Sequence, residues 1–154
     1  MHLLVKWVIT ILRVFVGGVF AYSGWNKLSK PVQEFQYAIE AYQAFPSTVN
    51  LVAAYTVPWI ELILGVFLIL GYFRRKTSIS LLCLTISFLT LLISTKIRGI
   101  EIANCGCFGE GVHLTVTQAI MVDTSLALAL FFLTKFRDQF LEIDQLIKSH
   151  HVQS

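Results

Sequence analysis

The chemistry that this sequence could perform centres on two cysteines separated by a single glycine. They lie in a glycine-rich run, Asn104-Cys105-Gly106-Cys107-Phe108-Gly109. A disulfide closed over one residue forms a very small ring, in which the S–S torsion can hardly reach its relaxed value. Because a strained disulfide exchanges more readily than a relaxed one, the spacing favours a labile redox pair.

Two other roles for the pair stay open on the residues alone. A structural disulfide would stabilise little, because so short a loop removes little entropy from the unfolded chain. A metal site that included His113 would have three obvious ligands and no second cysteine pair, so we predict no metal site. The third cysteine, Cys83, lies inside an apolar segment, where we expect a small buried hydrophobe.

A second set of reactive groups lies within or beside long apolar segments. Arg13, Glu61 and Asp123 fall inside such segments, and Lys27 follows the first one. A charge inside a bilayer is costly, so each should face the protein interior with a partner. Counting about 1.5 Å per helical residue, we expect Arg13 and Glu61 to meet near the midplane, with Asp123 slightly above. This column of charged residues could relay protons or hold a quinone-like acceptor. Alternatively, it could form a buried ion pair that fixes the register of the helices.

The composition indicates what positions these groups. The chain has 154 residues, of which 56% are hydrophobic and 14% charged, whereas soluble domains average about 25% charged residues. Apolar segments occupy residues 3–23, 51–73, 78–95 and 116–134, and about 20 residues cross a bilayer as a helix. We therefore predict an all-α integral membrane protein, a bundle of four transmembrane helices in residues 1–135.

The basic residues indicate the orientation of the bundle and exclude one class of partner. Arg74, Arg75 and Lys76 link the second and third segments, which predicts a cytoplasmic loop there and cytoplasmic termini. The Cys-Gly-Cys run then lies outside the cytoplasm, where disulfides persist. The basic residues form no long run interleaved with aromatic residues, so we predict no nucleic-acid partner. The apolar segments predict a lipid bilayer as the surroundings.

Two amphipathic segments flank the predicted bundle. Apolar residues recur at helical spacing in the first outer loop, at Phe35, Ala38, Ile39, Tyr42 and Phe45. Pro31 suits the start of this short helix and Pro46 its end. The helix either packs across the mouth of the bundle or anchors at the membrane surface. Residues 136–154 are predicted to form an amphipathic cytoplasmic tail.

Several short motifs together resemble a known family. They are Arg13 with Gly17-Gly18, Ser23-Gly24-Trp25-Asn26-Lys27, Pro58-Trp59-Ile60-Glu61, Gly65, Gly71, the Cys-Gly-Cys run and Asp123. Over about residues 5–135 the chain resembles the MauE/DoxX family of redox-associated membrane proteins, most closely its MauE branch. Where that family often has Asp before the first cysteine, this chain has Asn104, which removes one charge.

The resemblance implies a four-helix bundle similar in outline to the vitamin K epoxide reductase and disulfide-bond-forming enzymes of membranes. It implies a bacterial cytoplasmic membrane and a role in the redox maturation of periplasmic proteins, as in methylamine utilisation. The implied partner is a thioredoxin-like periplasmic protein or a secreted substrate that contains cysteine. No cofactor is certain, and a quinone is kept as a candidate.

The leading hypothesis is thiol–disulfide exchange outside the cytoplasm through Cys105 and Cys107. A second hypothesis is a non-catalytic scaffold or assembly factor that docks a thioredoxin-like partner. A third is a small-molecule or metal carrier that uses the charged column of Arg13, Glu61 and Asp123.

Overall fold

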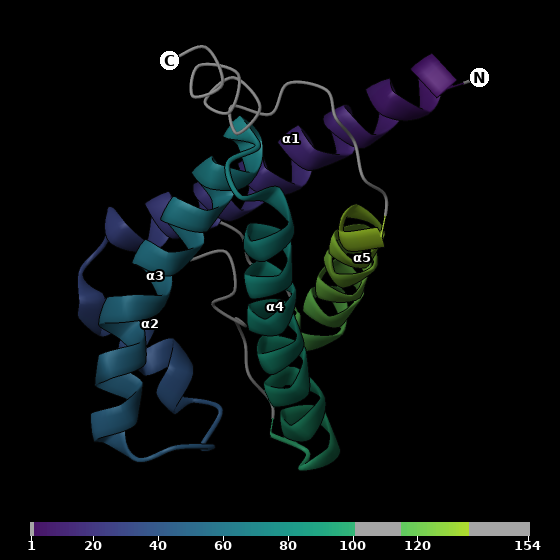
Figure 1. Cartoon of the computed structure of the whole chain (residues 1–154). Coiled ribbons are helices and arrows are strands. Elements are labelled where there is room, and N and C mark those ends of the chain that lie inside the picture. The colour runs from purple at the N-terminus through teal and green to yellow at the C-terminus, as the bar shows by residue number, and fades with distance from the viewer. Residues whose placement is uncertain (1, 101–114, 136–154) are drawn as a thin grey trace.

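The computed structural model describes residues 2–100 and 115–135, which form five α-helices without a strand (Figure 1). The helices are α1 (His2–Leu28), α2 (Val32–Glu40), α3 (Ser47–Leu70), α4 (Arg74–Ile97) and α5 (Val116–Lys135). The predicted all-α class is confirmed. The predicted cytoplasmic tail, residues 136–154, lies outside the described residues.

Four of the helices, α1, α3, α4 and α5, are long and apolar enough to cross a membrane. Helices α3 and α4 have 24 residues each, a length of about 36 Å at 1.5 Å per residue. The hydrocarbon core of a bilayer is about 30 Å thick. The structure therefore confirms the predicted helical membrane bundle.

The helix ends differ from the ends of the apolar segments. Helix α1 continues past residue 23 to Leu28 and so includes Lys27. Helix α3 begins at Ser47 and ends at Leu70, where Gly71 adopts a left-handed φ of 73°. The backbone N–H groups of Gly71 and Tyr72 bond to the last carbonyls of α3, a common way for a helix to end. The hydropathy of the sequence does not predict where such backbone hydrogen bonds end a helix.

The short helix predicted in the first outer loop is α2. It begins after Pro31, as expected, and ends at Glu40. The prediction that Pro46 ends this helix is wrong, because Pro46 precedes the first residue of α3 and caps its start. Phe35 and Ile39 of α2 are buried with Ala54 of α3, so α2 packs onto the bundle rather than lying free at the surface.

The long helices form two close pairs, α1 with α3 and α4 with α5. Small residues allow the first pair to pack backbone against backbone. A methyl group added at Gly65 would lie 2.6 Å from the Ala21 nitrogen, and one at Gly24 would lie 2.6 Å from the Pro58 carbonyl oxygen. Close approach through glycine and alanine is typical of membrane helices, which lack a hydrophobic driving force between them.

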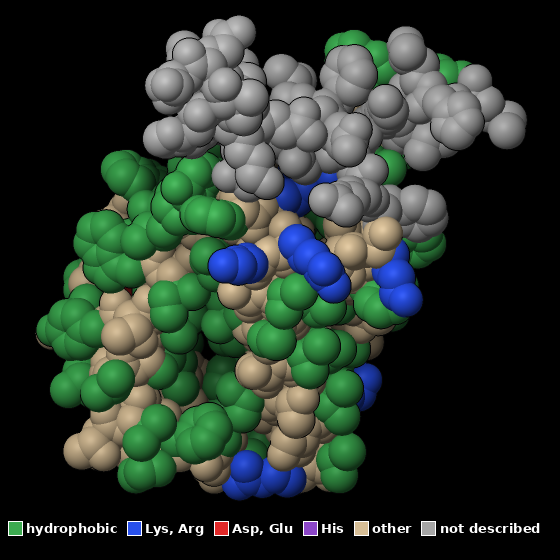
Figure 2. All heavy atoms as spheres, in the orientation of Figure 1, with side chains coloured by type: hydrophobic (Ala, Val, Ile, Leu, Met, Phe, Trp, Pro, Cys, Tyr) green, Lys and Arg blue, Asp and Glu red, His purple; other side chains and the backbone are tan. Residues whose placement is uncertain are grey.

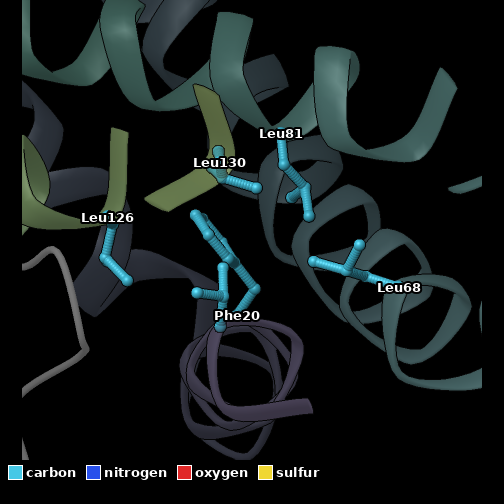
Figure 3. Packing of buried hydrophobic residues seen from close by; sticks show 6 residues of the cluster. Phe20, Leu68, Leu81, Leu126 and Leu130 are labelled. Atoms are coloured by element: carbon cyan, nitrogen blue, oxygen red, sulfur yellow. The ribbon is translucent and has the colours of Figure 1, made fainter. Parts of the chain in front are cut away.

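The two pairs meet around a hydrophobic core to which all four long helices contribute. Phe20 of α1 packs with Leu68 of α3, Leu81 of α4, and Leu126 and Leu130 of α5 (Figure 3). Each of these side chains is at most 7% exposed. This core holds the four long helices together. A cluster of polar residues lies beside the core, on the side that α2 covers.

The outer surface of the bundle is apolar. Hydrophobic side chains cover much of the face shown in Figure 2. Large exposed hydrophobic residues occur on every long helix, among them Phe15, Trp59, Ile86 and Phe132. So extensive an apolar surface is typical of contact with lipid. The prediction that Cys83 is buried is wrong, since its side chain is exposed on α4 and faces this surface.

Candidate functional site

The centre of the polar cluster is a buried ion pair between Lys27 of α1 and Glu61 of α3. The Lys27 Nζ donates to Glu61 Oε1 at 2.8 Å and to Oε2 at 2.7 Å. The two side chains are 1% and 7% exposed. Because a charge buried in the membrane is costly without a partner, each residue makes the position of the other tolerable.

The residues around the ion pair complete its surroundings. Ser23, one turn before Lys27 on α1, donates its hydroxyl to Glu61 Oε2 at 3.1 Å. The Lys27 ammonium lies 4.8 Å from the Phe35 ring centroid and 5.7 Å from that of Phe88. A desolvated cation gains from such aromatic faces. Helix α2, through Phe35, therefore covers the ion pair.

A small cavity adjoins the pair at the meeting of all four long helices. Ser23, Glu61, Thr85 and Asp123 supply its polar lining, and the apolar lining is Phe20, Leu84, Phe88 and Leu126. Its volume of about 30 Å³ accommodates about two water molecules. Drug-sized ligands occupy pockets of roughly 300–1,000 Å³, so the cavity as it stands is far too small for a quinone ring.

Asp123 of α5 brings a second carboxyl group to this cavity. The residue is 6% exposed. Within the part of the chain that the structure describes, its Oδ2 atom has no hydrogen-bond partner. Asp123 is seven residues after the start of α5, which places it about 10 Å below that end of the bundle.

The predicted meeting of Arg13 with Glu61 is wrong. Glu61 pairs with Lys27 instead. Arg13 is buried but precedes Lys27 by 14 residues on α1, a rise of about 21 Å. The contact of Gly17 with Gly65 and Ile69 sets the antiparallel register of α1 and α3, which leaves Arg13 beside the far end of α3. Of the predicted column, the structure brings together Lys27, Glu61 and Asp123.

Three contacts organise the end of the bundle nearest the cluster. Arg98, just after α4, donates to the carbonyl oxygens of Tyr42 and Gln43 at 3.2–3.3 Å and so holds the chain that follows α2. Lys96 Nζ donates to Thr117 Oγ1 at 3.2 Å. Since Lys96 is near the end of α4 and Thr117 near the start of α5, these two helix ends lie side by side.

That segment carries the predicted catalytic pair. Cys105 and Cys107, with Asn104, Gly106, Phe108 and Gly109, lie outside the described residues, which resume at Thr115. Among the described residues, no group of three or more His, Cys, Asp or Glu side chains could hold a metal ion.

The opposite end of the bundle gathers positive charge. Arg74 at the start of α4 is buried and donates to the Leu133 carbonyl oxygen at 3.1 Å, near the end of α5. A cation at a helix C-terminus is favourable, because the last carbonyls carry partial negative charge. Arg75, Lys76 and Lys135 lie at the same end.

Sequence reasoning missed the part that α4 plays in the cluster. Thr85 and Phe88 line the cavity, yet the segment around them contains no charged residue. The Thr85 hydroxyl bonds to the Leu81 carbonyl one turn back, as threonines commonly do in membrane helices. A buried Thr and a partly buried Phe in an apolar helix carry no signal that separates them from ordinary packing residues.

Comparison with known proteins finds relatives that align with most of this chain. The chain is 27% identical over 127 residues to methylamine utilization protein MauE of Paracoccus denitrificans, an alignment that covers 80% of this chain and 68% of that protein. It is 30% identical over 134 residues to protein TlpB of Flavobacterium psychrophilum, covering 79% of this chain. The matched part is 36% of TlpB, so the chain spans about a third of that relative. No solved structure matches.

One protein family matches residues 5–136, which is most of the chain and includes all four helices able to span a membrane. On this evidence the chain belongs to the family described as methylamine utilisation protein MauE.

Proposed function

We propose that this chain is a membrane-anchored thiol–disulfide exchanger that acts outside the cytoplasm through Cys105 and Cys107. One observation carries the proposal. The segment with the two cysteines joins α4 to α5 at the end of the bundle opposite Arg74, Arg75, Lys76 and Lys135. By the positive-inside rule the basic end is cytoplasmic, so the cysteines belong to the oxidising side.

The described residues support the orientation further. Of the basic residues at the cysteine end, Lys27 is neutralised within the bundle by Glu61. Lys30 pairs loosely with Glu34 at 3.9 Å. Because Lys27 is buried within the bundle, it is not one of the loop charges that the positive-inside rule counts, which leaves Lys30, Lys96 and Arg98 at the cysteine end. The proposed placement is a bacterial cytoplasmic membrane with both termini inside.

The exchange would proceed through a mixed disulfide. In one direction, a partner thiolate attacks the Cys105–Cys107 disulfide, forms an S–S bond to one sulfur and releases the other as a thiolate. The partner's second thiolate then attacks the mixed disulfide and releases the remaining cysteine. The partner loses two electrons and two protons and gains a disulfide, while the cysteine pair gains the same electrons and is protonated to a dithiol. The reverse exchange has the same balance.

The partner we propose is a thioredoxin-like periplasmic protein or a secreted protein with cysteines. Helix α2 and the adjoining chain held by Arg98 provide a fixed surface at the cysteine end. Functional sites supported by rigid elements hold their geometry more precisely than sites on loops alone. No quinone is required for the exchange itself.

Trapping tests the proposal. In membranes of cells that express Cys107→Ala, a mixed disulfide through Cys105 should appear on a non-reducing gel as a larger species that a reductant removes. The matched control is Cys83→Ala, which changes a lipid-facing cysteine and should trap nothing. If neither single variant of the pair traps a partner and the double variant retains full activity in cells, the protein acts as a scaffold instead.

A further inference from the structure

The cavity beside the ion pair has an unbalanced charge. Glu61 is matched by Lys27, which contacts both of its carboxylate oxygens. Asp123 lines the same cavity and, when ionised, adds a second negative charge. No other described charged residue lines the cavity, since α4 contributes Leu84, Thr85 and Phe88. The segment 101–114 contains no Lys or Arg that could balance it.

An uncompensated carboxylate at this depth would be expensive. Asp123 is 6% exposed, and its Oδ2 has no hydrogen-bond partner among the described residues. Burying an isolated ionised carboxylate in an apolar environment costs so much that such a group is usually neutralised instead. Either a proton or a small cation must therefore occupy the site.

The polar groups of the cavity favour the proton. A cation needs several oxygen ligands, and the charge of the Glu61 carboxylate is already matched by Lys27, which contacts both of its oxygens. The Ser23 hydroxyl donates to Glu61, and the Thr85 hydroxyl donates to a backbone carbonyl. The Lys27 ammonium would also repel a second cation. Asp123 is left as the main acceptor, and a proton requires only one.

We propose that the cavity is a proton-binding site in which Asp123 carries one exchangeable proton at neutral pH. The space for about two water molecules allows water to hydrogen-bond the acid and to exchange its proton with the aqueous side. This inference does not depend on thiol exchange and concerns residues distinct from the cysteines.

Infrared spectroscopy of the purified full chain in lipid vesicles tests the proposal. At neutral pH the spectrum should show the carbonyl stretch of one protonated carboxylic acid per chain, which shifts in D2O. Asp123→Asn, which mimics the neutral acid in shape, should remove this band. Glu34→Gln, which changes a partly exposed carboxylate of α2, should leave it intact. Because the band is first sought in the unmodified protein, the test holds even if Asp123→Asn fails to fold.

Two results would overturn the proposal. One is a spectrum without a protonated acid, together with a melting temperature that rises with sodium or potassium concentration, which would assign a cation site. The other is a band that persists in Asp123→Asn, which would place the proton elsewhere.

Discussion

Lys27 and Glu61 are 34 residues apart in the chain, yet their side chains form a buried ion pair with an N–O distance of 2.7 Å. The pair joins α1 to α3 at the level where α2 covers the bundle through Phe35. It also places Glu61 beside the cavity that Asp123 lines. One contact therefore links the packing of two membrane helices to the polar interior of the bundle.

Removing one partner of this pair should destabilise the protein more than removing both. Lys27→Met or Glu61→Leu alone leaves an uncompensated buried charge, which typically costs about 3–5 kcal/mol. The double variant Lys27→Met/Glu61→Leu leaves none and should recover most of the loss. Thermal unfolding in detergent micelles measures this. Equal losses for the single and double variants would show that the ion pair does not couple the two helices.

The close packing of α1 against α3 predicts a difference between two glycines. Gly65→Ala places a methyl group 2.6 Å from the Ala21 backbone nitrogen, and such overpacking typically costs about 1–3 kcal/mol. Gly18→Ala meets nothing within 4 Å and should be neutral or stabilise by up to about 1 kcal/mol, because alanine favours helix. The same unfolding measurement compares them. Similar behaviour of the two variants would contradict the observed register.

Helix α2 should contribute to stability through its buried face. Phe35 is 6% exposed and lies over Lys27, whereas Tyr37 on the same helix is 67% exposed. Phe35→Ala should cost about 3–5 kcal/mol, the usual range for a buried Phe. Tyr37→Ala should change the free energy of unfolding by less than about 0.5 kcal/mol. If both variants unfold like the unmodified protein, α2 is only loosely attached to the bundle.

The fold followed from hydropathy because a bilayer restricts spanning segments to long apolar helices. The partner of Glu61 did not follow, since the apolar segment ended at residue 23 while α1 continues to Leu28 and carries Lys27 inward. The depth of each residue in the membrane was estimated by counting residues along its own helix, and this estimate placed Arg13 near Glu61. The register is set by contacts such as Gly17 with Gly65, which a count along one helix cannot provide.

The exposure of Cys83 was mispredicted for a related reason. An apolar helix that faces lipid has no polar side to mark its outside, so the sequence does not distinguish buried from lipid-facing positions. In α4, the buried positions include Thr77, Ser78 and Thr85, while Ile79 and Ile86 face outward. Ser80, Ser87 and Thr90 of the same helix are exposed, so polar residues mark neither side of it.

The proposed thiol–disulfide exchange requires that Cys105 and Cys107 face the compartment outside the cytoplasm. Labelling intact cells with a membrane-impermeant maleimide after reduction tests it most directly, in a Cys83→Ala background that leaves only this pair. Both cysteines should be labelled without permeabilisation, and they should be protected from the label before reduction when they form a disulfide. Labelling that occurs only after the cells are permeabilised would place the pair in the cytoplasm and contradict the proposed exchange outside it.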